Sequence, residues 1–535
     1  LYFDQLDQVG DMLSAIQSKC RAASLCHLRF TPGEIEGAQF DESMLARGDV
    51  FLLDDNAVEK AFHQRFPGKK CFCAPDKTDT MEEILSDARD ESLVRIARSM
   101  EEVSTHKAPR VIAFYLPQYH PIPENDEWWG KGFTEWRNVK KTRPLFDGHY
   151  QPHVPADLGY YDLRDEETRT AQAELAMQYG IEGFCYYHYW FKGKRLLERP
   201  LEDLVESGKP DFPFCVCWAN EHWSRRWDGK DQELLQRQEY SEQDDLEHIR
   251  YLIRLFKDPR YIRVNGKPML LVYRAENIPD AARTAELWRK EVQKAGLTGL
   301  YLCRVESFVK GDPQDIGFDA SIEFAPDWWN KGPQLLAGSD RFDQADAEVR
   351  KAYEANYIHS YDGLADAMMA KPLPDYTWMR CVTPAWDNWA RRQKGASVFL
   401  DSTPEKYRQW LAAAVEDTNL RLHGEERIIF VNAWNEWAEG NHLEPDQRFG
   451  HAYLEATRDA LIEGQLKTTV KRLGAFDETR INRLTSQVAS GEYQINDLQH
   501  RLQDVLDSTS WRATVPLRWV KQRLLDLKML ISRLK

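Results

Sequence analysis

The strongest constraint on the fold is a series of eight short apolar runs that alternate with helix-like segments. The runs are rich in β-branched and aromatic residues and nearly free of charge, as is typical of parallel strands buried on both faces. They occupy residues 110–117, 181–190, 212–220, 267–274, 300–306, 320–324, 379–387 and 427–434. This alternation over about 350 residues predicts a (β/α)8 barrel with enlarged loops, within the α/β class.

A doubly wound parallel sheet is the alternative fold. It would place a glycine-rich phosphate loop after the first strand, and no such loop follows Leu116. Polar and aromatic side chains instead follow most of the strands, where the active site of a barrel is built. They are Gln118, His120, His188, Trp190, Asn220, Glu221, Glu306, Glu323, Trp386, Asp387, Glu436 and Glu439.

The last apolar run leads into the most chemically suggestive segment, in which Glu436 and Glu439 stand three residues apart among tryptophans. Two carboxyls held in apolar surroundings are costly to ionise together. Cleavage of a glycosidic bond needs such a pair, one acid for the leaving oxygen and one carboxylate for the other half of the displacement. The simpler interpretation is that the two glutamates cap a helix or pair with arginines.

Several longer motifs, in order along the chain, resemble one known family. They are Phe114–Pro123, Glu127–Trp136, Gly148–Pro152, Tyr186–Trp190, Trp218–Gly229 and Trp434–Gly440. With them the sequence resembles the WbsX-like family, which is related to glycoside hydrolase family 99. The resemblance covers residues 108–465 and implies a (β/α)8 barrel from bacterial loci that build O-antigens and other surface polysaccharides.

The resemblance also implies a mechanism for the two glutamates. By analogy with family 99, Glu436 takes the proton of the sugar 2-hydroxyl, so that a 1,2-anhydro sugar forms, and Glu439 protonates the leaving oxygen and then activates water. Ala438 departs from the family 99 pattern, which has histidine there, so mannose specificity is not carried over. Substrate contacts are expected from Tyr115, Gln118, His120, Trp129, Glu135, His188, Trp190, Trp218, Asn220, Glu221, Glu323, Trp386, Asp387, Trp434 and Asn435.

Composition excludes some alternatives. A net charge of −15 argues against a general nucleic-acid-binding protein. No apolar stretch reaches 18 residues and no signal peptide is visible, so we expect a cytoplasmic protein whose nine scattered cysteines are reduced. His149 and His153 are separated by a proline, and no nearby carboxylate completes a ligand set. We therefore expect neither a metal nor another cofactor.

Both ends of the chain differ from the barrel. Residues 1–78 are expected to form a small α/β region, with one strand at 48–54, and residues 79–107 a linker helix. Residues 478–508 show an a/d heptad pattern that predicts a coiled coil and a homo-oligomer, although a single helix packed on the barrel fits as well. Residues 511–535 form a basic amphipathic stretch that predicts either peripheral attachment to the inner membrane or a second packing helix.

These features favour a retaining, endo-acting glycoside hydrolase that acts on a bacterial surface polysaccharide, such as O-antigen, during its synthesis. Two alternatives stay open. One is a glycosyltransferase of O-antigen or capsule assembly, and the other is a barrel that binds glycans without catalysis.

Overall fold

A computed structural model describes residues 25–28, 50–53, 70–73, 108–225, 230–392 and 394–473. The first three segments are strands β1 (Leu25–Leu28), β2 (Val50–Leu53) and β3 (Lys70–Cys73), which pair in parallel in the order β1-β2-β3. The strand predicted at 48–54 is β2. The predicted linker helix, coiled coil and basic tail lie outside the described residues.

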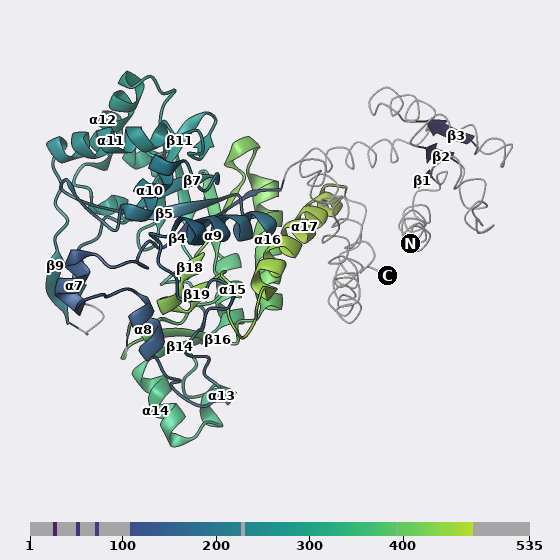
Figure 1. The fold of residues 1–535 in the computed structure, drawn as a ribbon. Coiled ribbons are helices and arrows are strands. Elements are labelled where there is room, and N and C mark those ends of the chain that lie inside the picture. The colour runs from purple at the N-terminus through teal and green to yellow at the C-terminus, as the bar shows by residue number, and fades with distance from the viewer. Residues whose placement is uncertain are drawn as a thin grey trace. The chain divides into compact units, whose positions relative to one another are not determined.

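Residues Ala108–Gln465 form one compact unit built on a closed parallel barrel (Figure 1). Its strands, in order, are β4 (Arg110–Tyr115), β5 (Gly183–Phe191), β7 (Phe214–Trp218), β11 (Lys267–Val272), β12 (Tyr301–Glu306), β13 (Ala320–Glu323), β15 (Trp378–Val382) and β17 (Ile428–Val431). Each strand pairs in parallel with the next, and β17 pairs with β4, which closes the barrel. The (β/α)8 prediction is confirmed.

The strands are buried on both faces, which explains their nearly uninterrupted apolar sequences. Aromatic rings fill the inside of the barrel, where Phe114 packs against Tyr187, Phe324 and Phe430. Five cysteines of the described residues, Cys185, Cys215, Cys217, Cys303 and Cys381, are buried free thiols.

Helices cover the outside of the barrel. They are α9 (Glu166–Gln178), α10 (Arg199–Ser207), α11 (Glu242–Phe256), α12 (Ala281–Lys294), α15 (Tyr361–Met369), α16 (Pro404–Arg421) and α17 (Ala452–Leu473). Side-chain caps start several of them: Asp165 accepts hydrogen bonds at the start of α9, Ser241 at α11 and Thr403 at α16.

Long loops with secondary structure of their own follow several strands. They carry α7 (Pro123–Trp129), α8 (Trp136–Lys141), the hairpin β8 (Trp223–Arg225)–β9 (Lys230–Gln236), α13 (Asp340–Asp343), α14 (Ala347–Ala355) and the parallel pair β14 (Tyr357–Ser360)–β16 (Ser397–Leu400). Shorter strands are β6 (Lys194–Leu196), β10 (Arg263–Val264), β18 (Asn435–Glu436) and β19 (Asn441–His442). These loops follow the carboxyl ends of the barrel strands, so they build the surroundings of the site.

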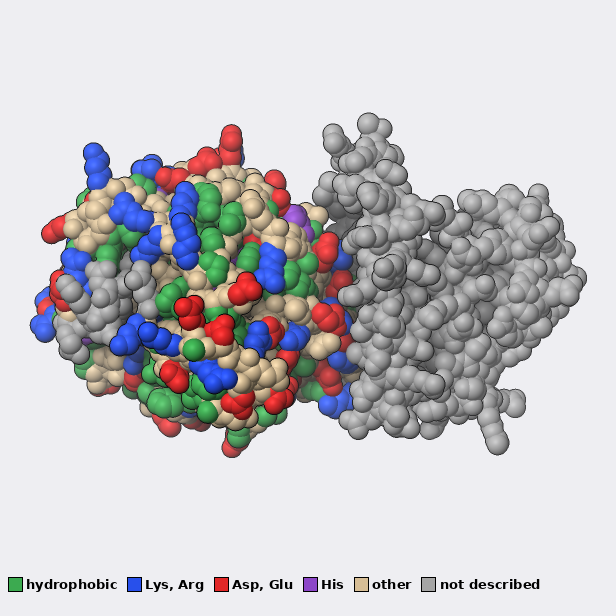
Figure 2. Space-filling view, turned by 90° about the horizontal axis from the view of Figure 1, so that it is seen from below, with side chains coloured by type: hydrophobic (Ala, Val, Ile, Leu, Met, Phe, Trp, Pro, Cys, Tyr) green, Lys and Arg blue, Asp and Glu red, His purple; other side chains and the backbone are tan. Residues whose placement is uncertain are grey.

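The surface is of mixed character. On the face shown in Figure 2, acidic and basic side chains of the described residues are interspersed with apolar ones. That face does not present a continuous basic surface of the kind that attracts nucleic acid. In the part of the chain that the structure describes, every helix is too short or too polar to cross a bilayer.

A buried ion cluster lies at the end of β13. The Nζ atom of Lys371 lies 2.9 Å from Oε1 of Glu323 and 2.9 Å from Oδ2 of Asp327, in close ionic contact, although neither pair is aligned as a hydrogen bond. Burial acts to raise the pKa of Asp327, but Lys371 and Lys310 lower it to about 2. Lys371 is the cation that both carboxylates share. Lys310 also lies 2.9 Å from Asp327, and Arg380 lies 3.6 Å from Glu323.

We predict that Lys371→Met lowers the free energy of unfolding by about 3 kcal/mol, because it leaves two buried carboxylates short of a partner. Denaturant unfolding measures the change. The matched control is Lys290→Met, which removes an exposed ion pair with Glu286 on α12 and should cost less than about 1 kcal/mol. Equal losses in the two variants would contradict the role of the buried cluster.

Candidate active site

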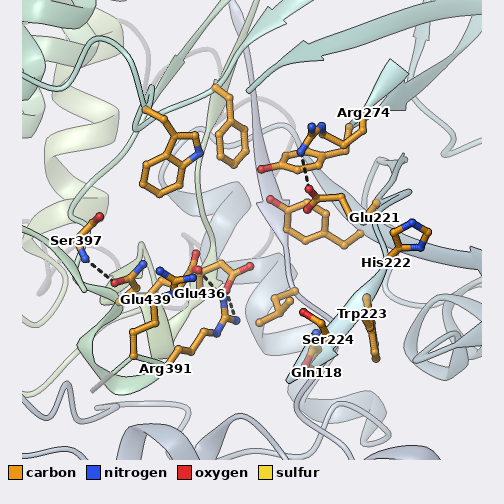
Figure 3. A pocket seen from close by; sticks show the side chains of 18 of the residues that line it. Gln118, Glu221, His222, Trp223, Ser224, Arg274, Arg391, Ser397, Glu436 and Glu439 are labelled. Atoms are coloured by element: carbon orange, nitrogen blue, oxygen red, sulfur yellow. Dashed lines mark hydrogen bonds and ion pairs between the residues drawn. The ribbon is translucent and has the colours of Figure 1, made fainter. Parts of the chain in front are cut away.

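A cavity of about 710 Å³ lies among the loops that follow the barrel strands. Glu436 and Glu439 line it, together with the indoles of Trp129, Trp223, Trp328 and Trp386 and the phenols of Tyr187, Tyr189 and Tyr273. Aromatic rings and a few charged groups in one concave site are typical of a small-molecule or sugar site. Figure 3 shows the two glutamates beside Arg391, across the cavity from Glu221 and Arg274.

The loop after β17 is fixed to the end of β4. The side chain of Asn435 accepts a hydrogen bond from the backbone N–H of Leu116 at 2.7 Å and donates one to its carbonyl at 3.0 Å. The Tyr119 hydroxyl donates to the carbonyl of Asn435 at 2.6 Å and accepts from the N–H of Trp437 at 3.1 Å. These contacts hold the backbone on both sides of Glu436.

The buried carboxyl of Glu444 also helps to hold this loop in place. Glu444 accepts hydrogen bonds from the Trp437 indole at 2.6 Å, the Tyr161 hydroxyl at 2.7 Å and the Gln172 amide at 2.6 Å. Burial raises the pKa of Glu444 to about 7, although the donors around it act to lower it. Trp434 and Trp437 are themselves buried, so they are packing residues of this loop rather than faces for a sugar.

Arg391 is the centre of the charged cluster. The sequence raised pairing of the two glutamates with arginines as the simpler interpretation, but it did not identify this arginine. Its Nη2 lies 2.7 Å from Oε2 of Glu436, its Nη1 lies 2.6 Å from Oε1 of Glu439, and its Nε lies 3.3 Å from Oε2 of Glu135. The two glutamates thus bind different terminal nitrogens of one guanidinium. The only signal for it in the sequence is the polar stretch Trp386-Asp-Asn-Trp-Ala-Arg391, which continues the seventh strand beyond the two residues predicted for the site.

The cluster is arranged to keep a proton. Burial raises the pKa of Glu436 to about 8, Arg391 opposes that effect, and the charges of Glu439 and Glu135 add to it. Burial also raises the pKa of Glu439, again against the effect of Arg391. Because Glu436 and Glu439 share this guanidinium in a buried place, ionisation of both near neutral pH is disfavoured. The protons belong to the cluster rather than to one residue.

The opposite wall of the cavity carries its own ion pairs. Arg274 lies 2.6 Å from Glu221 and 2.6 Å from Glu276, and its guanidinium packs 4.2 Å from the ring centroid of Phe308. Glu221 is therefore a paired carboxylate at the rim. This arrangement suits the binding of hydroxyl groups more than proton transfer.

Only part of the predicted site lines the cavity. The lining residues among those predicted are Gln118, Trp129, Glu221, Trp386, Glu436 and Glu439. The others lie outside the lining: Tyr115, His120, Glu135, His188, Trp190, Trp218, Asn220, Glu323, Asp387, Trp434 and Asn435. Most of these are buried polar or aromatic groups that hold the loops in place.

Several of the non-lining residues form internal contacts. His188 contacts His248 through their Nε2 atoms at 3.0 Å, and the Trp190 indole donates to Asp244 at 2.9 Å. Asn220 accepts from the N–H of Arg274 at 2.8 Å, which positions that arginine at the cavity wall. The Tyr115 hydroxyl donates to Gln172, and Glu323 belongs to the ion cluster described above.

Asp387 connects two loops behind the cavity. Its Oδ2 accepts hydrogen bonds from the Gln151 amide at 2.7 Å and lies 2.7 Å from Nε2 of His149, and its N–H donates to the carbonyl of Glu439 at 2.6 Å. Gly440 adopts a left-handed conformation there, and a Cβ atom on it would lie 3.0 Å from Cβ of Asp387. A glycine after Glu439 is therefore a requirement of this close approach.

Comparison with known families agrees with this geometry. A family model described as Glycosyltransferase WbsX matches residues 111–457, which is more than half of the chain and includes every barrel strand except the first residue of β4. The chain belongs to the WbsX family. Membership supports a glycan-active enzyme and leaves open whether it is a hydrolase or a transferase.

Two curated relatives are proteins named WxcX from Xanthomonas campestris pv. campestris, both described as uncharacterized. The protein of strain B100 is 46% identical over 351 residues, which are 66% of this chain and 49% of the relative. The protein of strain ATCC 33913 is 45% identical over 376 residues, 68% of this chain and 53% of the relative. The chain thus spans about half the length of these relatives.

Solved structures give weaker similarities. A glycoside hydrolase-like protein aligns with a TM-score of 0.43 at 13% identity, covering 66% of this chain and 94% of its own. The GH99 endo-alpha-mannosidase from Bacteroides thetaiotaomicron aligns with a TM-score of 0.42 at 15% identity, covering 67% and 98%. At these TM-scores the similarities carry no argument about activity, and the barrel stands on its own strand pairing.

We predict that Arg391→Met raises the pKa of Glu436 above about 8, by about 1 to 3 pH units, and raises that of Glu439 as well. The variant removes the positive charge that favours both ionised forms. Carbon-13 NMR of labelled glutamate carboxyls, assigned with Glu436→Gln and Glu439→Gln, follows the titration. The control is Arg137→Met, since Arg137 donates to the backbone carbonyls of Trp129 and Lys131. Unchanged or lowered pKa values in Arg391→Met would contradict this charge balance.

Proposed function

We propose that this WbsX-family barrel is a retaining glycoside hydrolase that cuts within a bacterial surface polysaccharide during its synthesis. The observation that carries the proposal is the buried pair Glu436 and Glu439, both bound to Arg391 at the wall of an aromatic cavity. A hydrolase needs one carboxyl that gives a proton and one that takes a proton, within reach of the same sugar.

The geometry suits attack by the neighbouring hydroxyl of the sugar itself. Both carboxyls approach the cavity from one short segment, so they reach the same side of a bound ring. In the proposed mechanism Glu436 removes the proton of O2, O2 attacks C1 to give a 1,2-anhydro sugar, and Glu439 gives its proton to the leaving oxygen. In the second step Glu439 takes a proton from water, whose oxygen attacks C1 and opens the three-membered ring. Glu436 returns its proton to O2, and the overall outcome is retention.

Arg391 explains how the two residues take different roles. The guanidinium favours one ionised carboxylate, and the remaining negative charge of the cluster favours a neutral neighbour. A bound sugar would place its O2 hydroxyl next to Glu436. That contact favours the protonation state in which Glu436 is the base and Glu439 holds the proton. The raised pKa values keep an acid available at neutral pH.

A glycosyltransferase of the same pathway is the second candidate, because the matching family is described as one. A third is a barrel that binds glycan without catalysis. The deciding experiment incubates the purified protein with the surface polysaccharide of its own source, with and without nucleotide sugars, and sizes the products. Shortened chains without nucleotide sugar support the hydrolase, nucleotide-dependent extension supports the transferase, and binding without any product supports the third candidate.

We predict that Glu439→Gln keeps the fold and lowers turnover about 10²–10⁴-fold, because the amide cannot give or take the proton. The assay is release of new reducing ends, with the melting temperature as the check on folding. The matched control is Glu286→Gln on the exposed face of α12, which should retain full activity. A fully active Glu439→Gln enzyme would remove Glu439 from the mechanism.

We also propose that residues 478–508 associate copies of the chain and that residues 511–535 bind an anionic membrane surface, holding the barrel near polysaccharide assembly. Support comes from the heptad pattern and from the contrast between a basic tail and a chain of net charge −15. Basic residues near an anionic surface contribute about 1 kcal/mol each.

We predict that a chain ending at residue 473 sediments as a smaller species than the full chain and no longer floats with anionic liposomes. Its activity on soluble glycan should be unchanged, since the barrel strands and loops are all retained. Equal sedimentation would reject the association through 478–508. Equal flotation, tested also with a chain ending at residue 510, would reject the membrane role of the tail.

A further inference from the structure

Three buried side chains outside the cavity converge behind the catalytic loop. They are His153, from the loop after α8, His442 in β19, and Asp446. One nitrogen of each histidine and one carboxylate oxygen all lie within 4.8 Å of one another. The sequence argued against a metal held by His149 and His153 together. In the structure His149 contacts Asp387, while His153 meets a histidine 289 positions later.

One of the two imidazoles points a lone pair at the other. Nδ1 of His442 lies 2.9 Å from the carbonyl of Glu444, to which it donates its hydrogen. Because a neutral imidazole carries one hydrogen, Nε2 of His442 holds a lone pair, and it faces Nδ1 of His153 at 2.8 Å. Such fixing of the tautomer by a carbonyl is typical of metal-bound histidine.

Asp446 is also oriented by its neighbours. Its Oδ1 accepts from the backbone N–H of Arg448 at 3.0 Å and of Phe449 at 2.6 Å. Its Oδ2 accepts from the Tyr150 hydroxyl at 2.8 Å and lies 3.9 Å from Nε2 of His442. A carboxylate oxygen has more than one acceptor position, so Oδ2 can serve both Tyr150 and a cation.

We propose that His153, His442 and Asp446 bind a divalent cation of the Zn²⁺ class. Two imidazole nitrogens and one carboxylate oxygen are a common donor set for that ion. Bonds of about 2.0–2.1 Å in tetrahedral geometry place ligand atoms about 3.3 Å apart. The separations of 2.8 and 3.9 Å lie on either side of that value, so small side-chain shifts accommodate the ion. Water would take the fourth position.

The site has a structural role in this proposal. The ring of His442 stacks on the indole of Trp437, with centroids 3.7 Å apart and planes 14° apart, and Trp437 stands between Glu436 and Glu439 in the loop. None of the three ligands lines the cavity. The cation would therefore tie the segment around His153 to the back of the catalytic loop, without touching the sugar.

The test uses the tag-free full chain, stripped with dipicolinate and then titrated with Zn²⁺ or Co²⁺. We expect binding of about one equivalent, a visible d–d band with Co²⁺, and a Zn²⁺-dependent rise in melting temperature of about 3–6 °C at saturating metal. His153→Gln and Asp446→Asn should each weaken binding about 100-fold or more. His359→Gln, at another buried histidine that contacts the carbonyls of Gly332 and Pro333, should bind as the parent chain does.

The competing explanation is a plain hydrogen bond between the two histidines. In that case the stripped and metal-loaded chains melt at the same temperature, no Co²⁺ band develops, and the variants lose stability in a metal-independent way. Either that result or unchanged Zn²⁺ affinity in both ligand variants would overturn the proposal. Because the parent chain is measured directly, a variant that fails to fold does not decide the outcome.

Discussion

The contact of one guanidinium with three carboxyls is the interaction on which the site depends. Arg391 reaches Glu436 and Glu439 with separate nitrogens and Glu135 with a third, at the wall of the cavity. Left alone, these carboxyls would either repel one another or all take up protons. One positive charge among them favours a cluster that holds both a proton and a negative charge, the combination that acid–base chemistry on a sugar would require.

The rest of the barrel keeps that contact in place. Tyr119 and Asn435 fix the loop to β4, Glu444 supports it from below, and Asp387 holds its far end through the carbonyl of Glu439. Each of these groups is buried. A site held on several sides by buried hydrogen bonds reaches the precision that catalysis needs better than one on an unsupported loop.

The fold and the glutamate pair could be predicted from the sequence because both are local signals. Runs such as Ile428–Val431 are apolar throughout, which predicts strands buried on both faces. The alternation of strands and helices then predicts the barrel. For the other polar residues that follow the strands, the sequence could not tell which line the cavity and which hold the loops in place. Asn220 and Glu221 are adjacent in the chain, yet only Glu221 lines the cavity, while Asn220 fixes the backbone of Arg274.

Arg391 and His442 show the other limit of sequence reasoning. Their importance comes from partners tens to hundreds of positions away, and neither stands in a pattern that indicates this. Arg391 meets Glu135 across 256 positions, and His442 meets His153 across 289. Such contacts follow from closure of the barrel, which the alternation of elements predicts only as a topology.

The pairing of β17 with β4 has a consequence for the order of events during synthesis. The hydroxyl of Tyr119 meets the N–H of Trp437 across 318 positions, at the seam where the first and last barrel strands join. Until the ribosome has delivered β17, the nascent sheet has two open edges and carries neither glutamate. The glutamate pair therefore reaches its place only when the barrel closes, and an unfinished chain lacks the site described above.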